Sequence, residues 1–113
     1  MLFLMLLIFS AQPLAIESAV GVVQKVKVFS LPPDRYNPND QAMLAIYVNE
    51  LPGACGSNEK RIAIGSAHPL FDAVTSIAMV SKTTKTKAVV GYLGSCSIRS
   101  NAWDFSFIEL LED

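Results

Sequence analysis

Apolar residues cluster along the chain in five blocks that have the length of β-strands and are rich in β-branched or aromatic side chains. Runs of proline, glycine, asparagine and serine separate the blocks, as is typical of turns and loops. The pattern predicts five strands, at Val20–Phe29, Ala42–Leu51, Arg61–Ala67, Thr86–Ser95 and Ala102–Leu111.

Two of the predicted strands have clearly different faces. Alternation with a period of two is typical of a strand that buries one face. In the first strand one face carries Val20, Val22, Val26 and Val28, and the other carries Lys25 and Lys27. In the last strand Trp103, Phe105 and Phe107 alternate with Asp104 and Ser106. Gly91, inside the fourth strand, indicates a bulge or a tight bend.

One segment, Pro69–Lys82, has the period of a helix instead. Proline suits the first helical position because its missing N–H would have no partner there. Asp72 in the first turn and Lys82 in the last complement the helix dipole. The stripe that faces the sheet is predicted to consist of Leu70, Phe71, Val74, Ile77, Ala78 and Ser81.

The predicted element order is β-β-β-α-β-β, a mainly β fold with one helix. Five strands with a helix between the third and the fourth is the layout of the OB-fold, a small Greek-key barrel. A bend at Gly91 suits barrel closure. The pattern therefore predicts a single OB-like barrel domain over residues 16–113.

The chain begins with nine apolar residues, Met1–Phe9, which are followed by SAQPLA. A membrane span needs about 20 apolar residues, whereas a short apolar run before small residues is typical of a signal peptide. We therefore predict a signal peptide at residues 1–15, a secreted or periplasmic protein, and no stable membrane insertion after cleavage. Against this, no lysine or arginine precedes the run and Pro13 stands three residues before the predicted cut, which leaves a buried N-terminal strand or helix as the alternative.

The two cysteines, Cys55 and Cys96, lie in the turn sequences GACGS and GSCS. In an exported chain an even number of cysteines favours a disulfide bond. In an OB barrel the second and fourth strands end on the same side, and one cysteine follows each of them, so the pairing is geometrically reasonable. The alternative is a metal-binding or reactive thiol. Zinc needs about four ligands, and two cysteines with one histidine and no CxxC motif do not supply them, so we expect no metal and no cofactor.

The first predicted strand opens with GVV, and HPLFDAVTSIAMVSKTTKTKAVVGY is a predicted helix that leads through a Lys/Thr turn into a valine-rich strand. In these features the chain resembles the B subunits of AB5 toxins, especially those of the subtilase-cytotoxin type. The resemblance extends to small uncharacterised secreted bacterial proteins with a cysteine after the second strand and another after the fourth. The resemblance implies an OB-type barrel, a ring-shaped homo-oligomer and glycan binding. The cysteine positions differ from those of the toxin subunits, and no ligand-binding residue is transferred from them.

Composition and the absence of known motifs exclude several classes of function. With 51% hydrophobic residues the chain is not intrinsically disordered, and a formal net charge of −1 argues against a nucleic-acid partner. The basic cluster at Lys82, Lys85 and Lys87 is read as a solvated turn. The sequence contains no phosphate-binding loop, dinucleotide motif or HExxH.

Candidates for catalysis are weak. His68 is the one histidine, and Ser66 and Asp72 lie near it in the sequence without a nucleophile elbow. Asp34 and Asp40 could hold calcium, but their spacing matches no EF-hand. We therefore expect a protein that is not an enzyme.

We expect the protein to bind a ligand or a partner rather than to catalyse a reaction. In an OB barrel the loops after the first and fourth strands flank the ligand face. The candidate binding residues here are Arg35, Tyr36, Asn37, Arg99, Asn101 and Trp103. For Tyr36 and Trp103 the alternative is a packing role. The leading hypothesis is glycan binding. The alternative function is binding of a protein partner without a small ligand, through an exposed strand edge or the mixed face of Val23, Lys25, Lys27 and Phe29.

Overall fold

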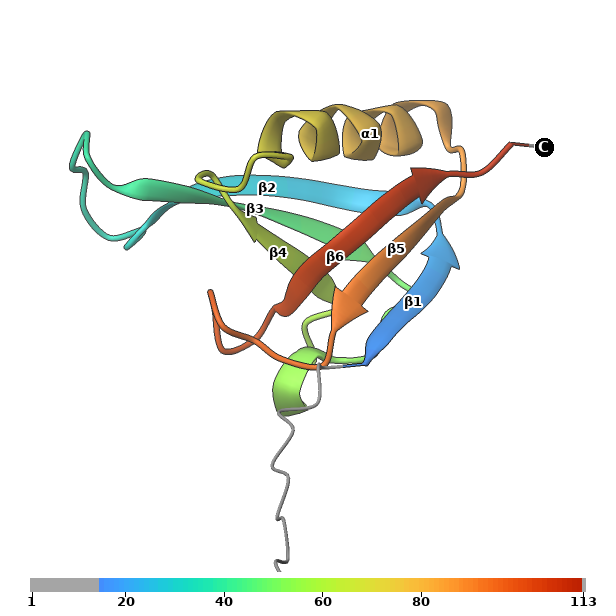
Figure 1. Ribbon diagram of the computed structural model, residues 1–113, viewed down its shortest axis with the longest axis horizontal. Helices are drawn as coiled ribbons and strands as arrows, with labels where there is room; N and C mark the ends of the chain where they lie inside the picture. The colour runs from blue at the N-terminus through green and yellow to red at the C-terminus, as the bar shows by residue number, and fades with distance from the viewer. Residues whose placement is uncertain (1–14, 113) are drawn as a thin grey trace, which may run out of the picture.

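The computed structural model describes residues 15–112, which form six strands, one α-helix and a short 3-10 turn (Figure 1). A mainly β fold with one helix is confirmed. The predicted signal peptide lies outside the described residues except for Ala15. The elements are β1 (Ile16–Gly21), β2 (Val23–Leu31), β3 (Gln41–Val48), η1 (Ala54–Gly56), β4 (Arg61–Gly65), α1 (Phe71–Thr84), β5 (Ala88–Leu93) and β6 (Trp103–Leu110). Within residues 15–112 no helix has the length and apolar character needed to cross a membrane.

The structure has six strands, so the predicted number of five was wrong. The first predicted strand is in fact two strands, β1 and β2, with Val22 alone between them. β1 pairs with β5 and β2 pairs with β3, both antiparallel. Valines occur on both sides of the break at Val22, so the pattern of hydrophobic residues does not reveal it. The change of partner depends on strands far away in the chain.

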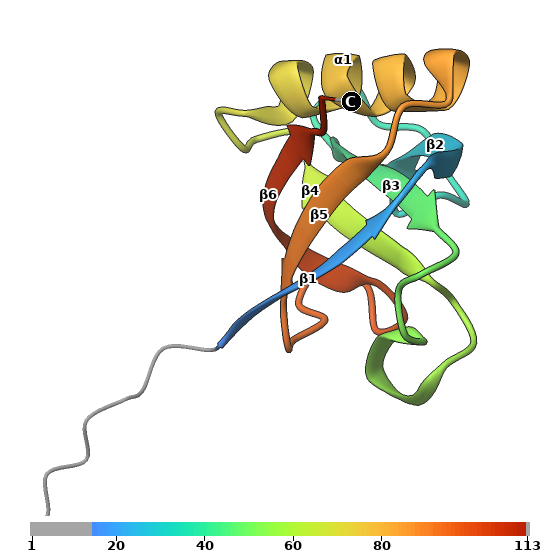
Figure 2. The ribbon, with the colours of Figure 1, turned by 90° about the vertical axis from the view of Figure 1, so that its right-hand side faces the viewer.

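The six strands form one open mixed sheet in the order β1-β5-β6-β4-β3-β2. β4 and β6 are parallel, and the other neighbours are antiparallel. β1 and β2, consecutive in the chain, stand at opposite ends of this order. The sheet is strongly curled, and α1 lies across one end of it (Figure 2).

The main core lies between the inner face of the sheet and α1, which packs against β2, β3 and β6. Its most deeply buried members on β3 and β4 are Leu44, Ile46, Val48, Ile62 and Ile64. Ser81 of α1 is fully buried beside them. Its hydroxyl accepts a hydrogen bond from the Val23 backbone N–H (3.0 Å) and donates one to the Thr86 carbonyl (2.7 Å). The helix is thus joined to β2 by a buried hydrogen bond as well as by apolar contacts.

The helix begins two residues later than predicted and ends two residues later. Leu70 is its N-cap and is 49% exposed, so Pro69 is not the first helical residue and Leu70 is not on the buried stripe. His68 explains the late start, because its Nδ1 accepts the Leu70 N–H (3.0 Å) in a turn that precedes the helix. Lys85 ends the helix in a left-handed conformation (φ 58°).

The irregularity predicted at Gly91 is confirmed, and it changes which side chains of β6 face the core. Gly91 pairs with Phe107, whereas the next residue of β5 pairs with Phe105, so Ser106 is an extra residue on β6. Beyond this bulge the two faces exchange places. Phe105 and Ile108 pack against the main core, and Phe107 is 37% exposed. The predicted strict alternation was therefore wrong beyond Phe105.

The predicted disulfide bond between Cys55 and Cys96 is confirmed, with a Cα–Cα distance of 6.5 Å. It joins η1 to the loop 94–102 between β5 and β6, at the end of the sheet opposite α1 (Figure 2). A disulfide is consistent with an oxidising location, outside the cell or in the periplasm.

Candidate functional site

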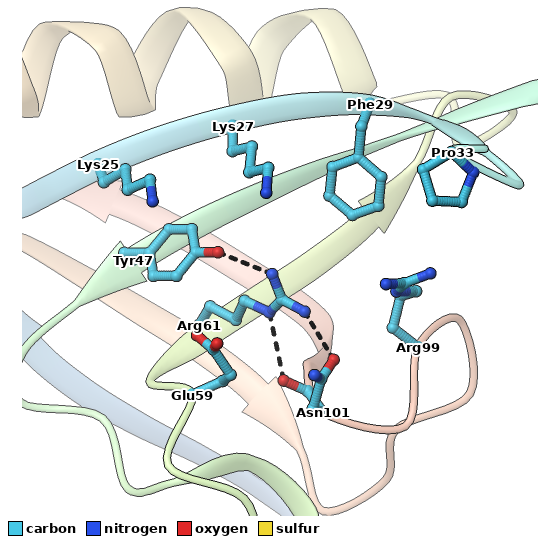
Figure 3. Close-up of a pocket in the computed structure, with 9 residues that line it drawn as sticks. All are labelled: Lys25, Lys27, Phe29, Pro33, Tyr47, Glu59, Arg61, Arg99 and Asn101. Carbon is cyan, nitrogen blue, oxygen red and sulfur yellow. Dashed lines mark hydrogen bonds between the residues drawn. The ribbon is translucent and has the colours of Figure 1, made fainter.

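A shallow hollow of about 370 Å³ lies on the outer face of β2, β3 and β4, the face turned away from the main core (Figure 3). Three adjacent strands supply most of its side chains. The loop 94–102, the loop 32–40 between β2 and β3, and the segment 57–60 before β4 contribute the rest. The lining residues are Lys25, Lys27, Phe29, Pro33, Tyr47, Glu59, Arg61, Arg99 and Asn101.

The strand register positions the charged and aromatic side chains. Tyr47 is the central residue, because it pairs with Lys25 on β2 and with Arg61 on β4. Residues directly opposite each other on neighbouring strands point to the same side of the sheet. Lys27 and Phe29 follow Lys25 on the same side of β2, since side chains alternate with a period of two.

The loop 94–102 covers part of this outer face and forms a second, smaller core there. Its Ala102 is fully buried together with Met43, Ala45 and Ala63. Phe29 packs against the same cluster from β2. The loop is therefore fixed on β3 and β4 by apolar contact as well as by the disulfide bond.

Asp104, just after this loop, fixes the loop by hydrogen bonds. Its carboxylate accepts the Ser97 N–H (2.9 Å) and the hydroxyls of Ser95 (2.6 Å) and Ser97 (2.6 Å). Burial acts to raise the pKa of Asp104, but the hydrogen bonds from these serines outweigh it and the pKa lies below its usual value. At neutral pH the ionised carboxylate therefore holds the turn that leads to Arg99 and Asn101.

Arg61 is the buried charge of the site, only 5% exposed. It donates hydrogen bonds to the Asn101 carbonyl (Nε, 3.2 Å), the Asn101 Oδ1 (Nη2, 2.6 Å) and the Tyr47 hydroxyl (Nη1, 2.7 Å) (Figure 3). All three acceptors are neutral. These bonds do not use every N–H of the guanidinium, which keeps its full positive charge.

The hollow contains two neighbouring clusters, and each cluster consists of one aromatic ring and two cationic side chains. In the Tyr47 cluster, Lys25 Nζ lies 4.9 Å and Arg61 Cζ 5.6 Å from the centre of the Tyr47 ring. Each distance is typical of a cation–π contact. The rings therefore help to hold the charged groups in place.

The Phe29 cluster has the same kind of arrangement, and its lysine, Lys27, lies two residues beyond Lys25 on β2. Lys27 Nζ and Arg99 Cζ each lie 5.3 Å from the centre of the Phe29 ring. Four of the chain's nine lysines and arginines thus line one hollow, together with a single carboxylate, that of Glu59. The hollow is a positive site in a chain whose formal net charge is −1.

The six predicted binding residues do not lie together in the structure, and only two of them line the hollow. Arg99 and Asn101 line the hollow. Arg35, Tyr36 and Asn37 lie exposed in the loop 32–40 and are not among the lining residues. Tyr36 is 82% exposed, so the alternative of a packing role does not describe it.

Trp103 lies on the inner side of the sheet. Its ring is 5.2 Å from the ring of Tyr92 and packs against the main core, and its Nε1 donates to the Pro52 carbonyl (3.0 Å). These contacts are the packing role that was the alternative for this residue.

Sequence reasoning missed Tyr47, Glu59 and Arg61 as site residues. The period of two had already placed Lys25 and Lys27 on a wet face, but nothing in the sequence indicated that the other residues lie across from them. The mixed face proposed for β2 was partly wrong, because Val23 is 1% exposed in the main core. A register irregularity between Val23 and Lys25 puts them on different faces.

Two of the residues considered for catalysis, His68 and Ser66, accept hydrogen bonds from the backbone. Besides its bond to Leu70, His68 packs edge-on against Phe105, with 5.6 Å between ring centres. Ser66 Oγ accepts the Ala42 N–H (2.8 Å). Within residues 15–112 no three histidine, cysteine, aspartate or glutamate side chains come together as a metal site.

Comparison of the chain with protein-family models, with curated proteins and with solved structures found no match.

Proposed function

We propose that this protein is an exported, non-catalytic binding module that holds a glycan in the hollow on the outer face of β2, β3 and β4. The observation that carries this proposal is the hydrogen-bonded group of Arg61, Asn101 and Tyr47. It presents guanidinium, amide and phenol groups on rigid strands and on a loop fixed by a disulfide bond. Such groups can bond sugar hydroxyls without first being ordered, which favours binding.

The strand order supports an OB-type barrel as the underlying fold. Val22 alone separates β1 and β2, yet β1 pairs with β5 and β2 with β3, at opposite ends of the sheet order. When β1 and β2 are counted as one bent strand, the layout has five strands and the helix follows the third. The hollow then lies on the face of the first three strands, which includes the second and third, and is flanked by the loops after the first and fourth, where OB-folds bind their ligands.

Export is supported by the disulfide bond together with the apolar start of the chain. The mature protein would begin near residue 16 and act outside the cell or in the periplasm. The resemblance to AB5-type B subunits adds a ring-shaped homo-oligomer to this proposal.

A glycan array probed with the protein tests the proposal. The full chain is expressed, and the exported product is purified in its oxidised form. We expect binding to at least one glycan class. Asn101→Ala should lose this binding, whereas Asn49→Ala, an exposed asparagine at the end of β3, should retain it. Absence of binding to any glycan, or equal binding by both variants, would reject the hollow as a glycan site.

A specific observation favours the second candidate function, binding of a protein partner. The outer face of β1, β5 and β6 exposes apolar side chains, with Ile16 62%, Val20 46% and Phe107 37% exposed. Exposed apolar groups in one area are typical of protein contact surfaces. Recovery of one stoichiometric partner from a pull-down, lost in Val20→Thr, would favour this function over glycan binding.

A further inference from the structure

We propose that the ligand of the hollow is a sulfated oligosaccharide that brings at least two anionic groups, one to the Tyr47 cluster and one to the Phe29 cluster. The inference rests on the proposed glycan-binding function and specifies its substrate class. It follows from the number of cations, from their arrangement and from the fact that cations lie over both aromatic rings.

The first step concerns charge. Arg61 is 5% exposed and bonds three neutral oxygen atoms. A charge removed from water without an ionic partner is costly, and an anion that enters the site supplies that partner. The planar guanidinium matches the paired oxygen atoms of an oxyanion, since it can donate two parallel hydrogen bonds.

The second step concerns the number of anionic groups. Lys25 and Lys27 are two residues apart on β2, which separates their Cα atoms by about 7 Å. Each lysine lies over a different ring and is joined there by a different arginine. One small anion can engage one cluster, but two clusters with four cations suit a chain that carries repeated charges.

The third step separates a glycan from a single-stranded nucleic acid. Single-stranded nucleic acid binds on strand faces largely by stacking its bases on aromatic side chains along a positively charged groove. Here cations lie over both rings, Lys25 and Arg61 over Tyr47, and the Phe29 ring is held in the same way. Recognition through charge and hydrogen bonds therefore takes precedence over stacking, which favours sulfate groups on a sugar chain.

Isothermal titration calorimetry with four probes tests the inference. The exported, oxidised protein is titrated with a heparin-derived hexasaccharide, with the same hexasaccharide after complete desulfation, with neutral chitohexaose and with oligothymidylate of equal charge. We expect the sulfated hexasaccharide to bind at least tenfold more tightly than each other probe, since one charged hydrogen bond contributes on the order of tenfold. Its affinity should fall as salt increases, because salt screens these charges.

Two variants localise the effect. Lys27→Ala and Arg99→Ala lie outside the hydrogen-bonded group of Arg61, so each should fold normally and bind the hexasaccharide about tenfold more weakly. The control, Lys82→Ala combined with Lys87→Ala, removes two charges from exposed positions away from the hollow and should bind like the wild type. Thermal unfolding of each variant verifies its folding.

Each other result overturns the inference in a different way. Equal loss in the control variant shows unspecific attraction to a polyanion. Tighter binding of oligothymidylate assigns the hollow to nucleic acid. Binding of desulfated or neutral sugars with no preference for sulfate overturns the sulfated class but leaves the proposed glycan function intact. Absence of binding to all sugars rejects both.

Discussion

The two outer faces of the sheet share one interior but differ in chemistry. On β2, β3 and β4 the outer face carries four cations over two aromatic rings and is partly covered by the loop 94–102. On β1, β5 and β6 the outer face exposes Ile16, Val20 and Phe107. The inner sides of both halves contribute to one core. Both faces contribute to stability, but the outer side chains differ between the two halves, so each outer face can serve a different contact.

Two structural devices produce the difference. On the cationic face the disulfide bond and Asp104 hold a loop against the strands, so that Arg99 and Asn101 meet side chains from β2 and β4. On the apolar face the bulge at Ser106 turns Phe107 outward over Gly91, where a methyl group would collide with the phenyl ring. The cationic face is thus completed by a loop fixed on the strands, whereas the position of Phe107 on the apolar face is set by a bulge between β5 and β6.

Removal of the disulfide bond should have the largest effect on the cationic face. Cys55→Ser with Cys96→Ser frees a loop with a sequence separation of 41 residues. We expect a loss of about 4 kcal/mol in the free energy of unfolding, because the unfolded chain regains the entropy that the bond removed. Urea unfolding measures it, with the reduced wild type as the control. An unchanged midpoint would show that the second core holds the loop without the bond.

Replacement of Arg61 should have the next largest effect. Arg61→Leu removes the donors for Asn101 and the Tyr47 hydroxyl, so we expect a loss of about 1–3 kcal/mol in stability. The matched control is Arg35→Leu at an exposed loop position, which should change stability by less than about 0.5 kcal/mol. Equal urea midpoints for both variants would contradict a structural role of the buried guanidinium.

The effect of Asp104 should be smaller and should depend on pH. Its folded-state pKa lies below that of the unfolded chain, so its carboxylate stabilises the fold above about pH 4 and loses this effect as the pH falls through the folded value. Asp104→Asn should therefore lower the thermal midpoint at pH 7 and approach the wild type in more acidic solution. The exposed Asp34→Asn serves as the control and should follow the wild type at every pH.

Changes on the apolar face should leave folding almost unaffected. Ile16→Thr with Val20→Thr alters exposed side chains, so we expect a change in stability of less than about 0.5 kcal/mol. If this face joins copies of the chain, light scattering should show an oligomer for the wild type and a monomer for the variant. An oligomer of the same size in both would assign assembly to another surface.

Much of the architecture could be predicted because its signals are local. The helix, the disulfide bond and the irregularity at Gly91 each depend on residues within a few positions of one another or on a count of cysteines. The break at Val22 and the outward turn of Phe107 could not be predicted. Both depend on which strand pairs with which, and this depends on residues far apart in the sequence.

The candidate site shows the same limit. Lys25 and Lys27 were visible as the wet face of a strand, and Arg99 and Asn101 as loop residues beside a ligand face. Trp103 has the aromatic character of a ligand contact, yet its place on the inner side of β6 makes it a packing residue. Arg61 stands at the start of a strand, where an exposed arginine would give the same sequence pattern. Only its neighbours in the folded sheet show that it belongs to the site.

Side-chain periodicity and turn chemistry along the chain specify a mainly β protein with one helix, because these properties arise between near neighbours, and the even number of cysteines favours a disulfide bond. Strand register and loop placement specify the cationic hollow. Register joins Lys25, Tyr47 and Arg61 across three strands, and the folded loop adds Arg99 and Asn101 to them. Such contacts between distant residues depend on the packing of the whole sheet, so no single stretch of sequence predicts them.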